Sequence, residues 1–238
     1  MELLLSSFHK GGPFMYCILT FGLLTIGFIV ERYIALYKNY NEAPKDFRKN
    51  ILAFIAGGDF SSAKDYIESS AANTSLGKVA MVACKMRQMG AGDEALQARM
   101  DEKLSTEISS IDRRTGFLGM FGNVATLFGL LGTVTGLIGS FAGVAAASPV
   151  ERANLLSTGI SEALNTTAFG LVAAIPALVA FAVYQNRTDS IVSSLTNQAS
   201  EIYHDFLFYT QSEEKRIIEE DSKGTSLSKR QRRAEATN

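Results

Sequence analysis

One carboxylate stands where a long apolar segment begins, beside amide and hydroxyl side chains. Asn165 and Thr166 follow Glu162 at steps of three and four residues, so the three share one face of a helix. An ionisable residue in a membrane span or at its edge is a functional candidate, because it can take part in a proton relay. An interfacial glutamate at a helix start, where the dipole favours a carboxylate, is an equally good interpretation.

A row of hydroxyls recurs every seven residues in the preceding apolar segment. Thr126, Thr133 and Ser140 fall on one helical face, and Asn123 extends the row. A single hydroxyl on a membrane helix often hydrogen-bonds to the preceding turn, so alone it indicates little. A row of them favours a helix interface or a narrow polar path that suits protons or small cations.

Glycines in the same segment form a second stripe. Alternating steps of three and four residues place Gly129, Gly132, Gly136, Gly139 and Gly143 on one helix face. Each glycine inside a helix costs about 1 kcal/mol relative to alanine, so the regular stripe indicates close packing against another helix. In the next apolar segment, Pro176 removes a backbone donor and predicts a kink.

Three windows without Asp, Glu, Lys or Arg are long enough to place these residues in a membrane. They contain 20, 36 and 24 residues, at 11–30, 115–150 and 163–186. Because about 20 helical residues cross a hydrocarbon core, the windows predict an all-α integral membrane protein. Its transmembrane helices are expected at 13–34, 115–146 and 160–185.

Two other interpretations of the windows are less favoured. Buried helices of a soluble protein rarely contain so many consecutive uncharged residues. A cleaved signal peptide does not fit the first window, because its apolar region is too long and no A-x-A site follows it. Glu31, Arg32 and Tyr33 instead resemble an interfacial stop at the end of a retained span.

Basic residues predict the orientation of the spans. They cluster after the first span, before the second and after the third, whereas only Lys10 and Arg152 flank the other side. The positive-inside rule then places the N-terminus in the periplasm and the C-terminus in the cytoplasm. The remaining segments are a periplasmic N-terminus, a cytoplasmic helical domain, a short periplasmic loop, a cytoplasmic helix extension and a charged tail, at 1–12, 35–114, 147–159, 186–212 and 213–238.

The cytoplasmic domain shows only helical patterns. Apolar positions at three- and four-residue steps predict helices over 46–55, 60–68 and 76–89. Asp93 is expected to begin a fourth helix that runs on into the second span. The tail from Glu213 is dense in both charges, which predicts a frayed or disordered segment. Its basic cluster at 229–233 fits contact with anionic lipid or a plain soluble tail equally well.

Composition excludes several classes of function. The 238 residues have a net charge of −1, with two cysteines and two histidines. These are too few for a disulfide framework or a four-ligand zinc site, and the chain lacks the basic charge of a nucleic-acid-binding domain. No histidine lies in a span and no two acids face each other there, so we expect no metal, no cofactor and no enzymatic activity.

Two ordered motifs resemble the MotA/TolQ/ExbB proton channel family, most closely its ExbB and TolQ branch. They read GLLGTVTG over 129–136 and GISEALNTTAFGLVAAIPA over 159–177. The resemblance implies a bacterial inner-membrane protein that forms a five-subunit ring around a single-pass partner of the ExbD or TolR type. That partner is implied to carry the membrane aspartate that moves protons.

The resemblance also implies roles for individual residues. Thr133 and Thr167 match the threonines that face the partner's aspartate, and Glu162 matches the glutamate of the third span. The chain departs from the family at Thr126, where proline is frequent, and at Thr135, where the best-known members have an aromatic residue. The candidate proton pathway comprises Thr126, Thr133, Glu162, Thr166 and Thr167.

The leading hypothesis is a proton-channel subunit of a motor that couples proton-motive force to work in the cell envelope. It would energise outer-membrane transport or integrity as a homopentamer, in contact with lipid, protons and the partner helix. One alternative is the stator subunit of a surface-motility motor. Another is a non-conducting scaffold in which the polar row only packs helices.

Overall fold

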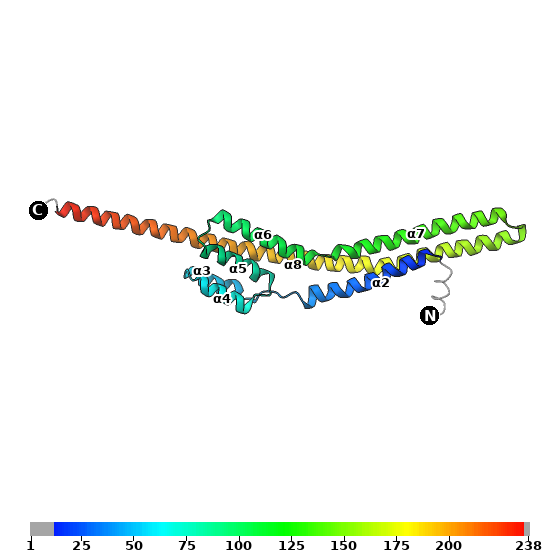
Figure 1. Cartoon of the computed structure of the whole chain (residues 1–238), viewed down its shortest axis with the longest axis horizontal. Helices are drawn as coiled ribbons and strands as arrows, with labels where there is room; N and C mark the ends of the chain where they lie inside the picture. Colours follow the sequence, from blue (N-terminus) through cyan, green and yellow to red (C-terminus); the bar gives the residue numbers. More distant parts are fainter. Residues whose placement is uncertain (1–11, 236–238) are drawn as a thin grey trace. The chain divides into compact units, whose positions relative to one another are not determined.

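Helices make up nearly all of the chain in the computed structural model, which describes the backbone of residues 12–235 and the side chains of 12–209 except Ala146. No strand occurs in this described part, so the predicted all-α class is confirmed. The elements (Figure 1) are α2 (Phe14–Tyr33), the π-helical turn η1 (Ile34–Lys38), α3 (Phe47–Ala56), α4 (Phe60–Ser70), α5 (Ser75–Gln88), α6 (Asp93–Asp112), α7 (Thr115–Ala146) and α8 (Pro149–Glu235).

Three stretches of helix are long and apolar enough to cross a membrane, as predicted. They lie within Phe14–Lys38, Asp93–Ala145 and Pro149–Tyr209. Large apolar side chains stand exposed along them, including Leu127, Ile138 and Leu164, each more than 60% exposed. Such a surface is unstable in water and stable in lipid, so the chain is a membrane protein.

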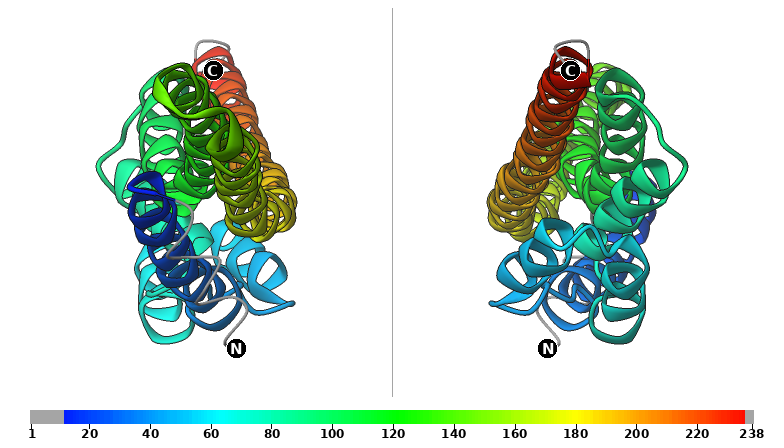
Figure 2. Two further views of the ribbon diagram at one scale, coloured as in Figure 1. Left: turned by 90° about the vertical axis from the view of Figure 1, so that its right-hand side faces the viewer. Right: turned by 90° about the vertical axis from the view of Figure 1, so that its left-hand side faces the viewer.

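The chain divides into two compact units, and the first combines residues up to Tyr40 with 111–190. In this unit α7 and the first half of α8 lie side by side as an antiparallel pair, and α2 packs along α7 (Figures 1 and 2). Phenylalanine rings join α2 to α7, with centroids 5.7 Å apart for Phe21 and Phe128 and 5.2 Å apart for Phe28 and Phe121. On the α8 side, the Tyr184 hydroxyl donates to the carbonyl of Ile29 at 3.1 Å.

The turn between α7 and α8 is shorter than the loop predicted over 147–159. Only Ala147 and Ser148 lie outside the helices. Pro149 occupies the first helical position, where its fixed φ suits a helix and its missing N–H costs nothing. The Ser148 hydroxyl donates a hydrogen bond of 2.7 Å to the carboxylate of Glu151, three residues later, and this bond stabilises the start of α8.

The helix predicted to run from Asp93 into the second span is instead broken before it. α6 ends at Asp112, and Arg114 has φ +75°, in the left-handed region that a continuous helix cannot contain. α7 then starts at Thr115. The pattern of apolar residues continues across the break, which is why the sequence predicted one helix.

The second unit combines 41–110 with the chain from Ile191 onward. Its core contains α3 to α6 together with the distal part of α8, and the Phe60 and Phe206 rings stack at 6.2 Å. Arg48 pairs with Asp205 at 2.9 Å and with Glu201 at 3.0 Å, which joins α3 to α8. These contacts fix the helices that the sequence predicted separately into one bundle.

The charged tail differs from its prediction. The backbone of α8 is helical through Glu235, whereas the sequence predicted a frayed or disordered segment from Glu213. Extending an existing helix avoids the costly nucleation step, and the tail is rich in glutamate, lysine and arginine, which favour helix.

Candidate functional site

The glycine stripe brings α7 and α8 into direct backbone contact over part of its length. A Cβ added at Gly129 would lie 3.2 Å from the Cα of Gly170, and one added at Gly132 would lie 2.2 Å from Cγ2 of Thr166. At Gly136 the added atom would lie 3.2 Å from the Ala163 side chain. Because no larger residue fits unchanged at Gly132, this part of the stripe sets the spacing of the two helices.

The other two glycines of the stripe have no such neighbour. A Cβ added at Gly139 or Gly143 would meet nothing within 4 Å. Their packing role therefore stays a prediction. The stripe continues in the other direction, since a Cβ at Gly122 would lie 2.8 Å from the Leu178 side chain. Gly122 stands seven residues before Gly129, so the heptad spacing already contained this signal.

Two glycines of α8 complete the contact and were missed from the sequence. A Cβ at Gly170 would lie 2.9 Å from the Ala125 carbonyl, and one at Gly159 would overlap the hydroxyl of Ser140. Pro176, farther along α8, lies in the helix interior and lines an apolar groove against α2 with Gly22 and Ala173.

Two of the candidate threonines meet at one peptide group. The Thr167 hydroxyl of α8 donates to the carbonyl of Gly129 in α7 at 3.0 Å. In a regular helix the same carbonyl is the acceptor for the backbone N–H of Thr133. The cross-helix bond exists because the glycines let the backbones approach. Thr133 and Thr167 therefore lie at the level where the two spans are in closest contact.

The remaining hydroxyls bond within their own helices. Thr133 donates to Leu130 at 2.6 Å and Thr126 to Gly122 at 3.0 Å, both in α7. In α8, the buried Thr166 hydroxyl donates to the backbone carbonyl of Glu162 at 3.0 Å. The hydroxyl oxygens of Thr126 and Thr133 each keep a lone pair that can accept a further hydrogen bond.

Glu162 lies in a separate polar cavity. Its carboxylate lies against the backbone just before α2, where a Cβ on Gly12 would be 2.7 Å from Oε1. The cavity has a volume of about 400 Å³ and contains hydroxyls from both α7 and α8, those of Thr135, Ser140 and Thr158. A space of this size and polarity is suited to water.

The structure thus separates the predicted pathway residues into two groups. Glu162 lines the polar cavity, whereas Thr126, Thr133, Thr166 and Thr167 lie outside its lining. Thr135 and Thr158 belong to the cavity and were not among the predicted site residues. Thr135 was noted in the sequence only as a departure from the family pattern. Thr158 stands four residues before Glu162 on α8, so the helical step already contained this signal.

A charged cluster at the α6–α7 break was also missed. Arg32 of α2 is only 5% exposed, and its guanidinium forms a bidentate pair with Glu31, with both N–O distances 2.7 Å. It also donates to the carbonyl of Arg113 and, at 3.5 Å, to that of Ile111. These carbonyls lose their helical partners at the break, so Arg32 caps the end of α6.

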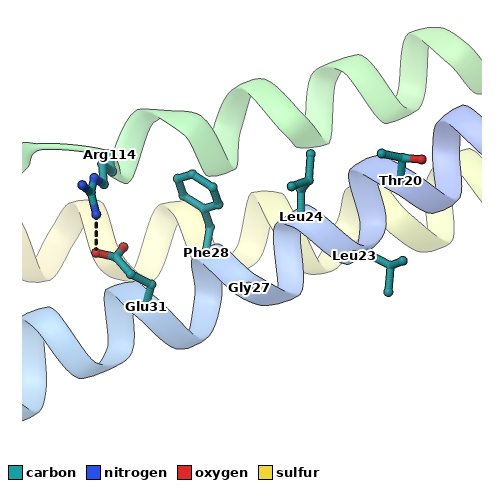
Figure 3. Close-up of a pocket in the computed structure, with 7 residues that line it drawn as sticks. All are labelled: Thr20, Leu23, Leu24, Gly27, Phe28, Glu31 and Arg114. Atoms are coloured by element: carbon teal, nitrogen blue, oxygen red, sulfur yellow. Dashed lines mark hydrogen bonds and ion pairs between the residues drawn. The ribbon is translucent and has the colours of Figure 1, made fainter.

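Arg114 completes this cluster from the other side. Its guanidinium Nη1 lies 3.2 Å from Oε1 of Glu31, at one end of a groove that runs along α2 (Figure 3). Within the described side chains, no three histidine, cysteine, aspartate or glutamate residues gather as metal ligands.

Comparison with known proteins identifies the family to which the chain belongs. A model of the MotA/TolQ/ExbB proton channel family matches residues 68–197, more than half of the chain. The match includes the α7–α8 contact, both threonines and the Glu162 cavity residues of these two helices. A search of curated proteins found no match. With this match and its three membrane-spanning helices, the chain belongs to the MotA/TolQ/ExbB proton channel family.

Proposed function

We propose that the chain is the ring-forming subunit of an ExbB/TolQ-like motor in the bacterial inner membrane. Five copies surround the membrane helix of an ExbD- or TolR-like partner, and proton flow through the ring does work on the envelope. The N-terminus is periplasmic and the C-terminus cytoplasmic. Family membership supports the channel function, and the distribution of basic residues supports the orientation.

One observation carries the proposal further. The Thr167 hydroxyl donates to the carbonyl of Gly129, one helical turn before Thr133, and the Thr133 hydroxyl donates to Leu130. Glu162, the only acid in 115–146 and 160–185, lies in a cavity that neither threonine lines. Hydroxyls can pass a proton along only when a titrating group stands beside them. At the level of these threonines this chain supplies none, so the proton-carrying carboxylate comes from another chain.

The test is proton flux through the complex in liposomes. The chain would be co-expressed with a short single-pass protein that carries an aspartate in its span, sought first among the neighbouring genes. Proton flux, read from the signal of a pH-sensitive dye, would be compared for Thr167→Val and Thr167→Ser. Valine removes the hydroxyl at similar volume, so it should abolish most of the flux, and serine should retain it. Thr25→Val, on α2, is the matched control for loss of a hydroxyl in a span, because the Thr25 hydroxyl donates only within its own helix, to Phe21.

The outcomes separate the channel from a scaffold. If Thr167→Val and Thr133→Val both assemble normally and keep full flux, the hydroxyls only pack helices and the conducting role is wrong. Glu162→Gln should impair flux more than assembly. α8 begins at Pro149, so Glu162 lies inside the helix and not at its start as the alternative interpretation expected. An unchanged flux in Glu162→Gln would mean that this carboxylate takes no part in conduction.

A further inference from the structure

We propose that the groove along α2 binds an anionic phospholipid, with its phosphate at Arg114 and an acyl chain along α2. The groove has a volume of about 490 Å³ and is lined by Thr20, Leu23, Leu24, Gly27, Phe28, Glu31 and Arg114. Figure 3 shows Leu24 and Phe28 pointing from α2 towards α7, with the Glu31–Arg114 pair at one end. One end is therefore charged and the rest is almost wholly apolar.

The length of the groove fits one leaflet. Its lining extends from Thr20 to Glu31, eleven residues along α2, which corresponds to about 17 Å of helix. Half of the hydrocarbon core is about 15 Å. An acyl chain whose headgroup lies at Glu31 and Arg114 would thus extend to the middle of the bilayer. A spanning helix of a second copy would need about twice this length.

The charge at the mouth of the groove fits a phosphate. Glu31, Arg32 and Arg114 together carry one net positive charge. Arg32 is buried and already binds both oxygens of Glu31 and the end of α6. The Arg114 side chain is 45% exposed and donates to Glu31 through Nη1. A guanidinium has five N–H donors, so a phosphate oxygen can bind to the others.

Gly27 leaves space in the middle of the groove. A glycine inside a helix is unfavourable, and close packing against α8 accounts for Gly129, Gly132 and Gly136 of the stripe. At Gly27 an added Cβ would meet nothing within 4 Å, so no helix of this chain requires the glycine. Its effect is to leave the middle of the groove unfilled, as an acyl chain requires.

Lipid retention by the purified full-length protein tests the proposal. The protein would be equilibrated in nanodiscs with equal parts of phosphatidylglycerol and phosphatidylcholine and released into mild detergent, and native mass spectrometry would count the lipids that stay bound. Wild type should retain phosphatidylglycerol preferentially. Arg114→Gln should lower that preference about fivefold, the effect of one basic side chain near an anionic surface, and Arg114→Lys should restore most of it.

A second set of variants in the lipid-retention experiment tests the effect of filling the groove. Gly27→Leu has space for its side chain and a better helix propensity, so the fold should persist while retention of both lipids is lost. Arg113→Gln and Gly116→Leu are matched controls, because neither residue lines the groove and Gly116 also has open space, and both should behave as wild type. Far-UV circular dichroism checks that each variant is folded.

Three results would overturn the proposal. The first is equal retention of the two lipids by wild type. The second is unchanged lipid binding in folded Gly27→Leu. The third is a Gly27→Leu protein that changes its oligomeric mass but not its lipid content, which would mean that a second copy of the chain occupies the groove. None of these results bears on proton flux, so the proposed function is tested separately.

Discussion

Replacing one glycine of the stripe by alanine should show that backbone contact holds α7 against α8. At Gly132 the new methyl group would lie 2.2 Å from Cγ2 and 2.9 Å from Cβ of Thr166. Carbon atoms pack at about 3.5–4.0 Å, so the helices must separate or Thr166 must move. The same change at Gly139 adds a methyl group with no neighbour within 4 Å.

The magnitudes follow from these contacts. Overpacking costs about 1–3 kcal/mol, and rotation of Thr166 would also lose its hydrogen bond to Glu162, worth about 1 kcal/mol. Alanine recovers about 1 kcal/mol of helix propensity at either site. Gly132→Ala should therefore destabilise the protein by about 1–3 kcal/mol. Gly139→Ala should be neutral or stabilising by up to about 1 kcal/mol.

A double variant identifies the clashing atom. Thr166→Ser removes Cγ2 and keeps the hydroxyl, so Gly132→Ala with Thr166→Ser should recover part of the lost stability. Unfolding in one detergent, followed by far-UV circular dichroism, measures all four proteins, with the oligomeric mass checked for each. The reasoning is wrong if Gly132→Ala is as stable as wild type, or if Gly139→Ala is destabilised equally.

Three further predictions concern charge and burial. Arg32→Met should destabilise the protein by about 1–3 kcal/mol in the same unfolding assay, because the carbonyls at the end of α6 lose their buried donor, while Glu31 keeps its pair with Arg114. An unchanged midpoint would contradict the capping role. Burial raises the pKa of Glu107, but hydrogen bonds from Lys103 and Lys78 outweigh that effect and leave the pKa below 4.5. The Glu107 carboxylate therefore stabilises the fold fully above about pH 4.5 and loses that contribution as the pH falls through the folded-state pKa. Acid unfolding of Glu107→Gln should consequently show a weaker pH dependence than wild type. Burial raises the pKa of the Cys84 thiol to about 12, so an alkylating reagent at pH 8 should label Cys84 only after unfolding, as read by peptide mass spectrometry.

The spans and their contact face could be predicted because both signals are local. The length of a charge-free run decides whether a helix can cross a bilayer, and the three spanning helices were predicted on that basis. The spacing of Gly129, Gly132 and Gly136 decides which face of α7 lacks side chains, whatever helix packs there. The helices of the second unit likewise follow from apolar steps of three and four residues.

The α6–α7 break could not be predicted, because its cause lies far away in the chain. Nothing around Arg114 forbids a helix, and the apolar pattern continues through it. Arg32, 81 residues before Arg113, supplies the hydrogen bond that the broken end needs. A buried guanidinium that satisfies free carbonyls is visible only when α2 and α6 are placed in space.

The site shows the same division. The sequence by itself placed Thr133 inside one long charge-free run and Glu162 directly before another. Only the tertiary structure decided their neighbours, joining Thr167 to the Gly129 carbonyl and placing the Glu162 carboxylate against Gly12. The physical reason is that a repeat fixes a face of one helix, whereas a hydrogen bond or cavity between helices depends on their register and separation, which are set by packing.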